Sequence, residues 1–148
     1  MRVPHNGFIV VADGEKALFF RNEGDGDFLH LIVEQKEQNH NPADRDQKSD
    51  QPGRAFAGAG SRRSAYEETD FHKLEEARFA ADTAEMLKAR ALRNEFDSLI
   101  VVAPSKTLGE LRKHYHKEVQ KRLAGEIAKD LTGHPVEEIE RILSAQQD

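Results

Sequence analysis

The sequence contains no cysteine, which excludes disulfides, thiolate metal sites and cysteine nucleophiles together. It also has no long apolar run: no window offers a secretory signal or the roughly 18 apolar residues that a membrane helix needs. An excess of positive charge is missing too, because 22 Lys and Arg stand against 27 Asp and Glu. The net charge of -5 argues against a protein that holds nucleic acid by overall charge, but it is compatible with a local basic patch. We expect a cytoplasmic protein with no membrane contact.

The chain of 148 residues fits one domain, 1–148, and its apolar runs predict strands at the start. Residues 8–12 and 17–20 are apolar and flank the turn residues 13–15, which predicts a β-hairpin. Residues 28–33 follow a second turn, and their unbroken apolar character predicts a third strand that is covered on both faces. The sheet therefore starts with a three-stranded meander.

Residues 35–69 show no apolar period, because glycine, proline, asparagine and serine interrupt every candidate repeat. We expect a mobile loop there. Connections beyond about 12–15 residues are uncommon in compact domains and are usually functional or disordered. Between Arg45 and Arg63 this segment carries five basic residues, and only Asp46 and Asp50 oppose them. Positive charge is concentrated in one part of an otherwise acidic chain.

The second half of the chain predicts helices that pack on the sheet. From Leu74 to Ala91, apolar residues recur at steps of three and four, which predicts a long amphipathic helix with Asp70 as its N-cap. Residues 99–103 predict a buried strand parallel to a neighbour. Helical spacing over 107–131 is interrupted by glycine, so one long helix and a helix followed by a strand are alternatives. Pro135 predicts the first position of a short terminal helix. The fold class is α/β, a single domain with a mixed β-sheet packed by helices.

Several familiar motifs fail, and no metal, cofactor or catalytic residue is predicted. Residues 53–58 have the glycine spacing of a phosphate-binding loop, but the lysine and serine or threonine that must follow are absent. Residues 25–27 begin like a calcium loop whose further oxygen ligands are missing. His114 and His116 would point about 200° apart on a helix, so we expect solvated or capping histidines.

The basic glycine-containing loop is the candidate site that remains. Guanidinium groups bind phosphate oxygens bidentately and glycine permits close backbone approach, which suits a polyanion such as RNA. The candidate nucleic-acid-binding residues are Arg45, Lys48, Arg54, Gly58, Gly60, Ser61, Arg62 and Arg63. The alternative is a disordered surface segment whose arginines only keep it soluble.

Several sequence elements together resemble the bacterial host-attachment family, proteins described as required for attachment to host cells. They are Thr-Asp-Phe-His-Lys at 69–73, Ala-Pro at 103–104, Leu-Gly-Glu-Leu-Arg at 108–112 and Lys-Asp-Leu-Thr at 129–132. That family is similar to the central domain of archaeo-eukaryotic class I peptide-release factors and of the ribosome-rescue protein Pelota, which implies an α/β fold with a mixed sheet. The resemblance also implies that residues 129–132 end a strand. Over 107–131 we therefore predict a helix that ends near Glu118, and then a strand at 123–128.

The resemblance also bears on catalysis. In release factors the long loop after the early strands carries Gly-Gly-Gln, which helps to position the water that cleaves peptidyl-tRNA. Here residues 58–63 read Gly-Ala-Gly-Ser-Arg-Arg, and the glutamine is absent. The resemblance therefore implies a protein that does not use the release-factor reaction.

We predict a cytoplasmic, non-enzymatic member of the host-attachment family that associates with RNA or the ribosome through its basic loop. One alternative is a hydrolase of peptidyl-tRNA or a phosphorylated substrate, with a pocket beside Asp13 and the ends of the strands. The other is a protein-interaction or adhesion regulator whose contact surface is the alanine-rich helix or the sheet edge.

Overall fold

The computed structural model describes residues 2–39 and 61–146, which form a five-stranded mixed sheet in the order β3-β2-β1-β4-β5. β1 (Phe8–Ala12) pairs antiparallel with β2 (Lys16–Asn22), and β2 pairs antiparallel with β3 (Leu31–Gln38). On the other side, β4 (Leu99–Ala103) is parallel to β1, and β5 (Leu123–Ala128) is parallel to β4. The predicted α/β class, the opening meander and the parallel strand at 99–103 are confirmed.

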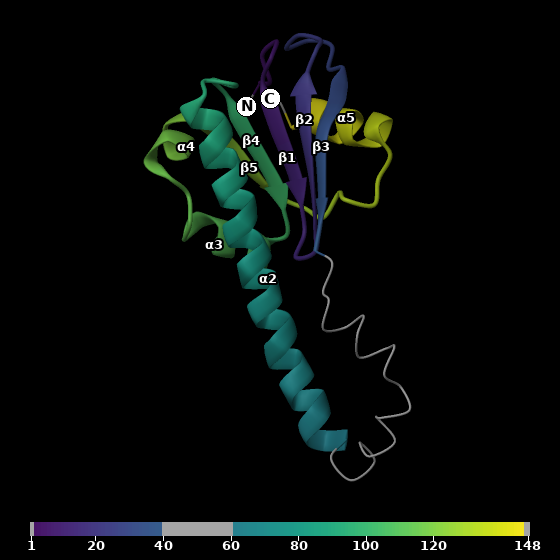
Figure 1. The fold of residues 1–148 in the computed structure, drawn as a ribbon. Coiled ribbons are helices and arrows are strands. Elements are labelled where there is room, and N and C mark those ends of the chain that lie inside the picture. Colours follow the sequence, from purple (N-terminus) through teal and green to yellow (C-terminus); the bar gives the residue numbers. More distant parts are fainter. Residues whose placement is uncertain (1, 40–60, 147–148) are drawn as a thin grey trace.

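Helices cover both faces of this sheet (Figure 1). α2 (Ser61–Leu92), α3 (Ser105–Arg112) and α4 (Lys117–Arg122) pack on one face, and α5 (Val136–Ala145) packs on the other. Each residue of β1 and β4 is buried, and alternate residues of β1 join two separate apolar clusters. Such doubly covered central strands read as unbroken apolar runs, which is why the sequence located them well.

β3 differs from its prediction. The strand begins at Leu31, and most of its residues are exposed. The preceding residues form a turn instead, because the Asp25 carboxylate accepts hydrogen bonds from the backbone amides of Asp27 and Phe28 at 2.9 and 2.8 Å. Phe28 is 79% exposed. The expectation of a strand over 28–33 covered on both faces was therefore wrong, since β3 is an edge strand and starts three residues later.

The long helix also differs from its prediction, because α2 begins at Ser61 and Asp70 lies inside it rather than at its N-cap. The sequence after Gly60 contains no glycine or proline for many residues, so nothing in it stops a helix from starting early. Regular structure thus occupies both ends of the loop expected at 35–69, as β3 up to Gln38 and as α2 from Ser61. The centre of that loop, residues 40–60, lies outside the described residues.

The end of α2 follows from a backbone motif. Asn94 has φ 58°, and its amide donates to the Ala91 carbonyl at 2.9 Å, while the Glu95 amide donates to the Arg90 carbonyl at 3.0 Å. This pair of bonds is the Schellman arrangement, which asparagine tolerates better than most residues other than glycine. It turns the chain from α2 towards β4.

Over residues 107–131 the prediction of a helix followed by a strand is confirmed, with a finer division of the helical part. α3 ends at Arg112 and α4 starts at Lys117, and β5 follows without a break. His116 lies between the two helices and caps α4, because its Nδ1 accepts from the Glu118 amide at 3.0 Å. The capping role expected for a histidine of this pair is therefore present. Pro135 is the residue directly before α5 rather than its first residue.

An ion-pair network attaches the edge strand β3 to its neighbours. Arg21 of β2 binds both carboxylate oxygens of Glu34, at 2.7 and 3.2 Å. Arg90 of α2 reaches the same carboxylate at 3.1 Å, Glu95 at 2.9 Å and the Gln35 side-chain oxygen at 2.8 Å. The hydrogen bond from Arg21, with the charges of both guanidinium groups, lowers the pKa of Glu34 from its usual value of 4.5.

Replacing Glu34 by glutamine is expected to lower the free energy of unfolding at neutral pH by about 1–2 kcal/mol, because two arginines lose their charged partner. A depressed pKa gives stability that is present above the unfolded value near 4.5 and is lost as the pH falls through the lower folded value. The gap between wild type and variant should therefore narrow below about pH 4.5 in urea unfolding. The exposed Glu23, replaced by glutamine, serves as the control. A gap that stays constant across this range contradicts the assignment.

Candidate functional site

A groove of about 600 Å³ lies between the β2–β3 pair and residues 132–136, which lead into α5. Its apolar lining comes from Leu18, Phe20, Val33, Pro135 and Val136. Its polar lining includes Lys16, Lys36, Gln38, Thr132 and His134. A volume of this size is within the usual range of ligand sites, which combine apolar walls with a few polar groups.

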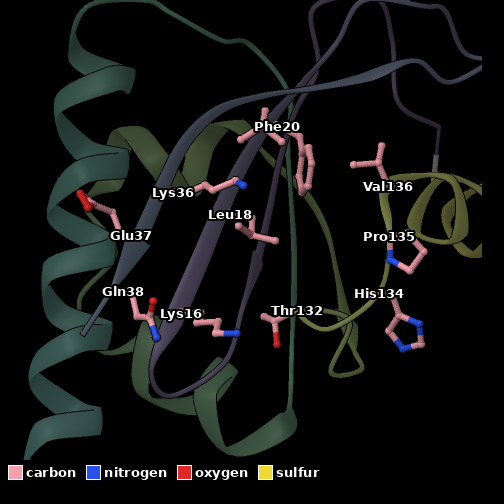
Figure 2. A pocket seen from close by; sticks show the side chains of 11 residues that line it. Lys16, Leu18, Phe20, Lys36, Glu37, Gln38, Thr132, His134, Pro135 and Val136 are labelled. Carbon is pink, nitrogen blue, oxygen red and sulfur yellow. The ribbon is translucent and has the colours of Figure 1, made fainter. Parts of the chain in front are cut away.

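The strand register explains why two lysines share this groove. Lys16, Leu18 and Phe20 alternate along β2 and so project from one face of the sheet. Leu18 is paired with Lys36 of β3, which places Lys36 on that same face, diagonally across from Lys16. Figure 2 shows both lysines pointing towards the segment with Thr132 and His134.

One acidic residue, Glu37, also lines the groove beside Lys36. Glu37 points away from the two lysines in Figure 2, and its Oε1 accepts a hydrogen bond from Gln35, which also contacts Met86 of α2. Within the described part of the chain, neither Lys16 nor Lys36 forms a salt bridge. The groove therefore presents two ammonium groups over an apolar floor.

Asp13 holds two residues that line the groove, Lys16 and Thr132. Its Oδ1 accepts from the backbone amides of Glu15 and Lys16 at 2.7 and 2.6 Å, which shapes the hairpin turn. Its Oδ2 lies 2.8 Å from the Thr132 hydroxyl, which is also 3.0 Å from Asp130. Oδ1 of Asp13 thus holds the hairpin turn after β1, and Oδ2 joins that turn to the connection between β5 and α5. Asp13 acts here as a positioning residue.

A smaller pocket of about 120 Å³ lies on the α2 side of the same end of the sheet. Its lining includes Lys73, Glu76, Lys106 and Glu110, two cations and two carboxylates. Because these charges balance, this pocket has less preference for an anion than the groove. Among the described residues, no three His, Asp or Glu side chains are grouped so as to hold a metal ion. In the same ranges, no helix is long and apolar enough to cross a membrane.

The residues predicted from the sequence as a nucleic-acid site fall into two sets. Five of them, Arg45, Lys48, Arg54, Gly58 and Gly60, lie outside the described residues. The other three, Ser61, Arg62 and Arg63, form the first turn of α2. This turn lies far beyond the end of the sheet, as Figure 1 shows. Their role in binding stays a prediction.

The groove residues were not found from the sequence. Lys16, Lys36 and His134 are far apart in the chain, and only the pairing of β2 with β3 and the return of the chain before α5 bring them together. One signal was available: Lys16, Leu18 and Phe20 alternate as one face of a strand does. No comparable signal marked Lys36, because the apolar run of the third strand had ended by Val33.

Comparison with known proteins gives a family. The model of bacterial archaeo-eukaryotic release factor family 12 matches residues 6–143. A comparison with curated proteins finds no match. Six chains of solved structures match, among them the crystal structure of the archaeal translation termination factor, aRF1. That structure is 14% identical with a TM-score of 0.48, and the alignment covers 95% of this chain and 36% of that chain.

Proposed function

The chain belongs to bacterial archaeo-eukaryotic release factor family 12, and from this premise we propose that it is a translation-related domain that binds RNA, alone or in the ribosome, without catalysing a reaction. In this proposal the basic segment between Arg45 and Arg63 makes the phosphate contacts. The attachment to host cells implied by the sequence resemblance would then be an indirect effect, through the translation of other proteins.

The observation that carries the proposal is the uneven charge of this segment. It has five basic and two acidic residues in a chain whose net charge is -5. Its described end, Ser61–Arg63, opens a helix that extends past the sheet (Figure 1). Basic residues placed away from the acidic body of a protein can approach a phosphate backbone with less repulsion.

The proposal is tested by replacing Arg54, Arg62 and Arg63 together with alanine. Loss of three phosphate contacts should reduce the slope of log affinity against log salt by about two to three, depending on whether the RNA is single- or double-stranded. Co-sedimentation of the variant with ribosomes should fall in parallel.

A matched control removes three arginines elsewhere. Arg78, Arg93 and Arg141 have side chains that are 71%, 64% and 69% exposed, and their replacement by alanine changes the net charge equally. We expect this control to bind as the wild type does. The proposal is wrong if the loop variant co-sediments with ribosomes as well as the wild type and the control.

One observation favours a second function, the binding of a protein. β3 is an edge strand, and Ile32 and Val33 on it are 41% and 36% exposed. An exposed edge strand can pair with a strand of another chain. Capture of a protein partner after nuclease treatment, with no RNA recovered, would favour this function over the first.

A further inference from the structure

We propose that the groove between β2, β3 and residues 132–136 binds nucleotides of unpaired RNA and so extends the contact made by the basic segment. The inference rests on the proposed function, and it adds a second site on the opposite face of the sheet from α2. It assigns a role to Lys16 and Lys36, which the sequence motifs did not single out.

Two lysines give the groove its positive charge. Lys16 and Lys36 are exposed and lie diagonally across two paired strands, where two like charges repel each other. Neither has a salt-bridge partner among the described residues. Two such ammonium groups suit an anion that carries more than one negative charge, as adjacent phosphates do.

The floor of the groove between the two lysines is apolar. Leu18 lies beside Lys36 in the register, and Val33 and Pro135 complete an apolar surface that is open to solvent. Nucleobases have apolar faces, which bind such surfaces once the bases are unstacked, whereas a double helix hides these faces. The exposed His134 adds a ring on the opposite wall. Single-stranded RNA fits this groove, because its phosphates can contact the two lysines while its bases lie on the apolar floor.

The groove lies next to the start of the basic segment along the chain. Gln38, the last residue of β3, lines the groove, and the Asn39 amide donates to the Glu15 carbonyl at 2.7 Å. Arg45, the first residue of the basic segment, follows Asn39 by six residues in the sequence. The carboxylates of Asp13 and Asp130 at this end of the sheet both accept from the Thr132 hydroxyl, and Asp13 also accepts from two backbone amides.

The test uses the full chain and a short fluorescent oligouridine as the probe. The double variant Lys16→Ala/Lys36→Ala should reduce the slope of log affinity against log salt by about 1.4, since each phosphate contact on a single strand contributes about 0.7. That change corresponds to roughly tenfold weaker binding at about 0.15 M salt. In the wild type, the oligouridine should shift the amide NMR signals of Leu18 and Val136, and the double variant should lose these shifts.

The control is Lys113→Ala/Lys121→Ala, which removes the same charge from the C-cap of α3 and from α4, where the lysine side chains are 66% and 69% exposed. If the groove variant binds like this control while the Arg54/Arg62/Arg63 variant is weakened, the groove inference is wrong and the proposed function stands. If the wild type binds no RNA, both fail. If uridine monophosphate alone shifts the same signals at similar concentrations, the groove is a free-nucleotide site and the RNA assignment is overturned.

Discussion

Replacing Asn22 by alanine is expected to lower the free energy of unfolding by about 3 kcal/mol or more. Asn22 ends β2 and is fully buried, with 0% exposure. Its side-chain amide lies within hydrogen-bond distance of the carbonyls of Val3, Pro4 and Asp25, at 3.1, 3.2 and 3.2 Å. The Val3 and Asp25 carbonyls lose this donor in the alanine variant, whereas the Pro4 carbonyl keeps its bond from the Gly7 amide at 2.9 Å. An unsatisfied buried group costs about 1–3 kcal/mol.

The side-chain oxygen of Asn22 forms further hydrogen bonds. It accepts from the backbone amides of Gly24 and His30, at 2.9 and 3.0 Å. The same side chain thus holds the N-terminal segment and the turn that leads into β3. Its loss should loosen both, and with them the strand that carries Lys36.

The measurement is urea unfolding followed by circular dichroism. Asn22→Asp keeps the two acceptor bonds but removes the donors and buries a charge, so it should also be destabilised. Asn39→Ala is the control, because within the described residues the Asn39 side chain makes no hydrogen bond. A loss below about 1 kcal/mol for Asn22→Ala would show that the network is not needed.

Replacing Phe8 by alanine is expected to cost about 3–5 kcal/mol, the usual range for a buried phenylalanine. Phe8 is 0% exposed and stacks on Phe96, with 5.1 Å between ring centroids and an interplanar angle of 7°. The guanidinium carbons of Arg90 and Arg21 lie 5.0 and 5.3 Å from its ring centre. The variant therefore loses apolar burial, aromatic stacking and two cation–π contacts at once.

Phe28→Ala removes the same side chain from a position that is 79% exposed, and it should change stability by less than about 0.5 kcal/mol. The free energy of unfolding of both variants is measured by thermal or urea denaturation. The difference between them gives the contribution of burying the phenylalanine ring at position 8. Equal effects would mean that the ring of Phe8 is not part of the core.

The elements predicted best from the sequence are those whose burial is decided locally. β1 and β4 lie at the centre of the sheet, so each position is apolar and the runs at 8–12 and 99–103 mark them with correct bounds. β3 was predicted at 28–33 but spans Leu31–Gln38, because an edge strand needs no apolar pattern. The first residues of the apolar run belong to the turn that the Asp25 carboxylate holds. The sequence therefore indicated a third strand but not its bounds.

The candidate site shows the same division. The basic segment was found because its residues are neighbours in the chain. Lys16, Lys36 and His134 were not, because their proximity depends on which strands pair and on where the chain returns after β5. Nothing in the sequence indicates that two lysines in separate strands lie on the same surface. The groove is formed by tertiary contacts, which the sequence pattern does not show.

The length of α2 has one more consequence. Lys73 lines the pocket beside Gly14, and the N-terminal part of α2 continues past the sheet in Figure 1. At about 1.5 Å per residue, residues 61–72 form a helical arm of about 18 Å. A partner reached by the tip of this arm does not have to touch the body of the domain.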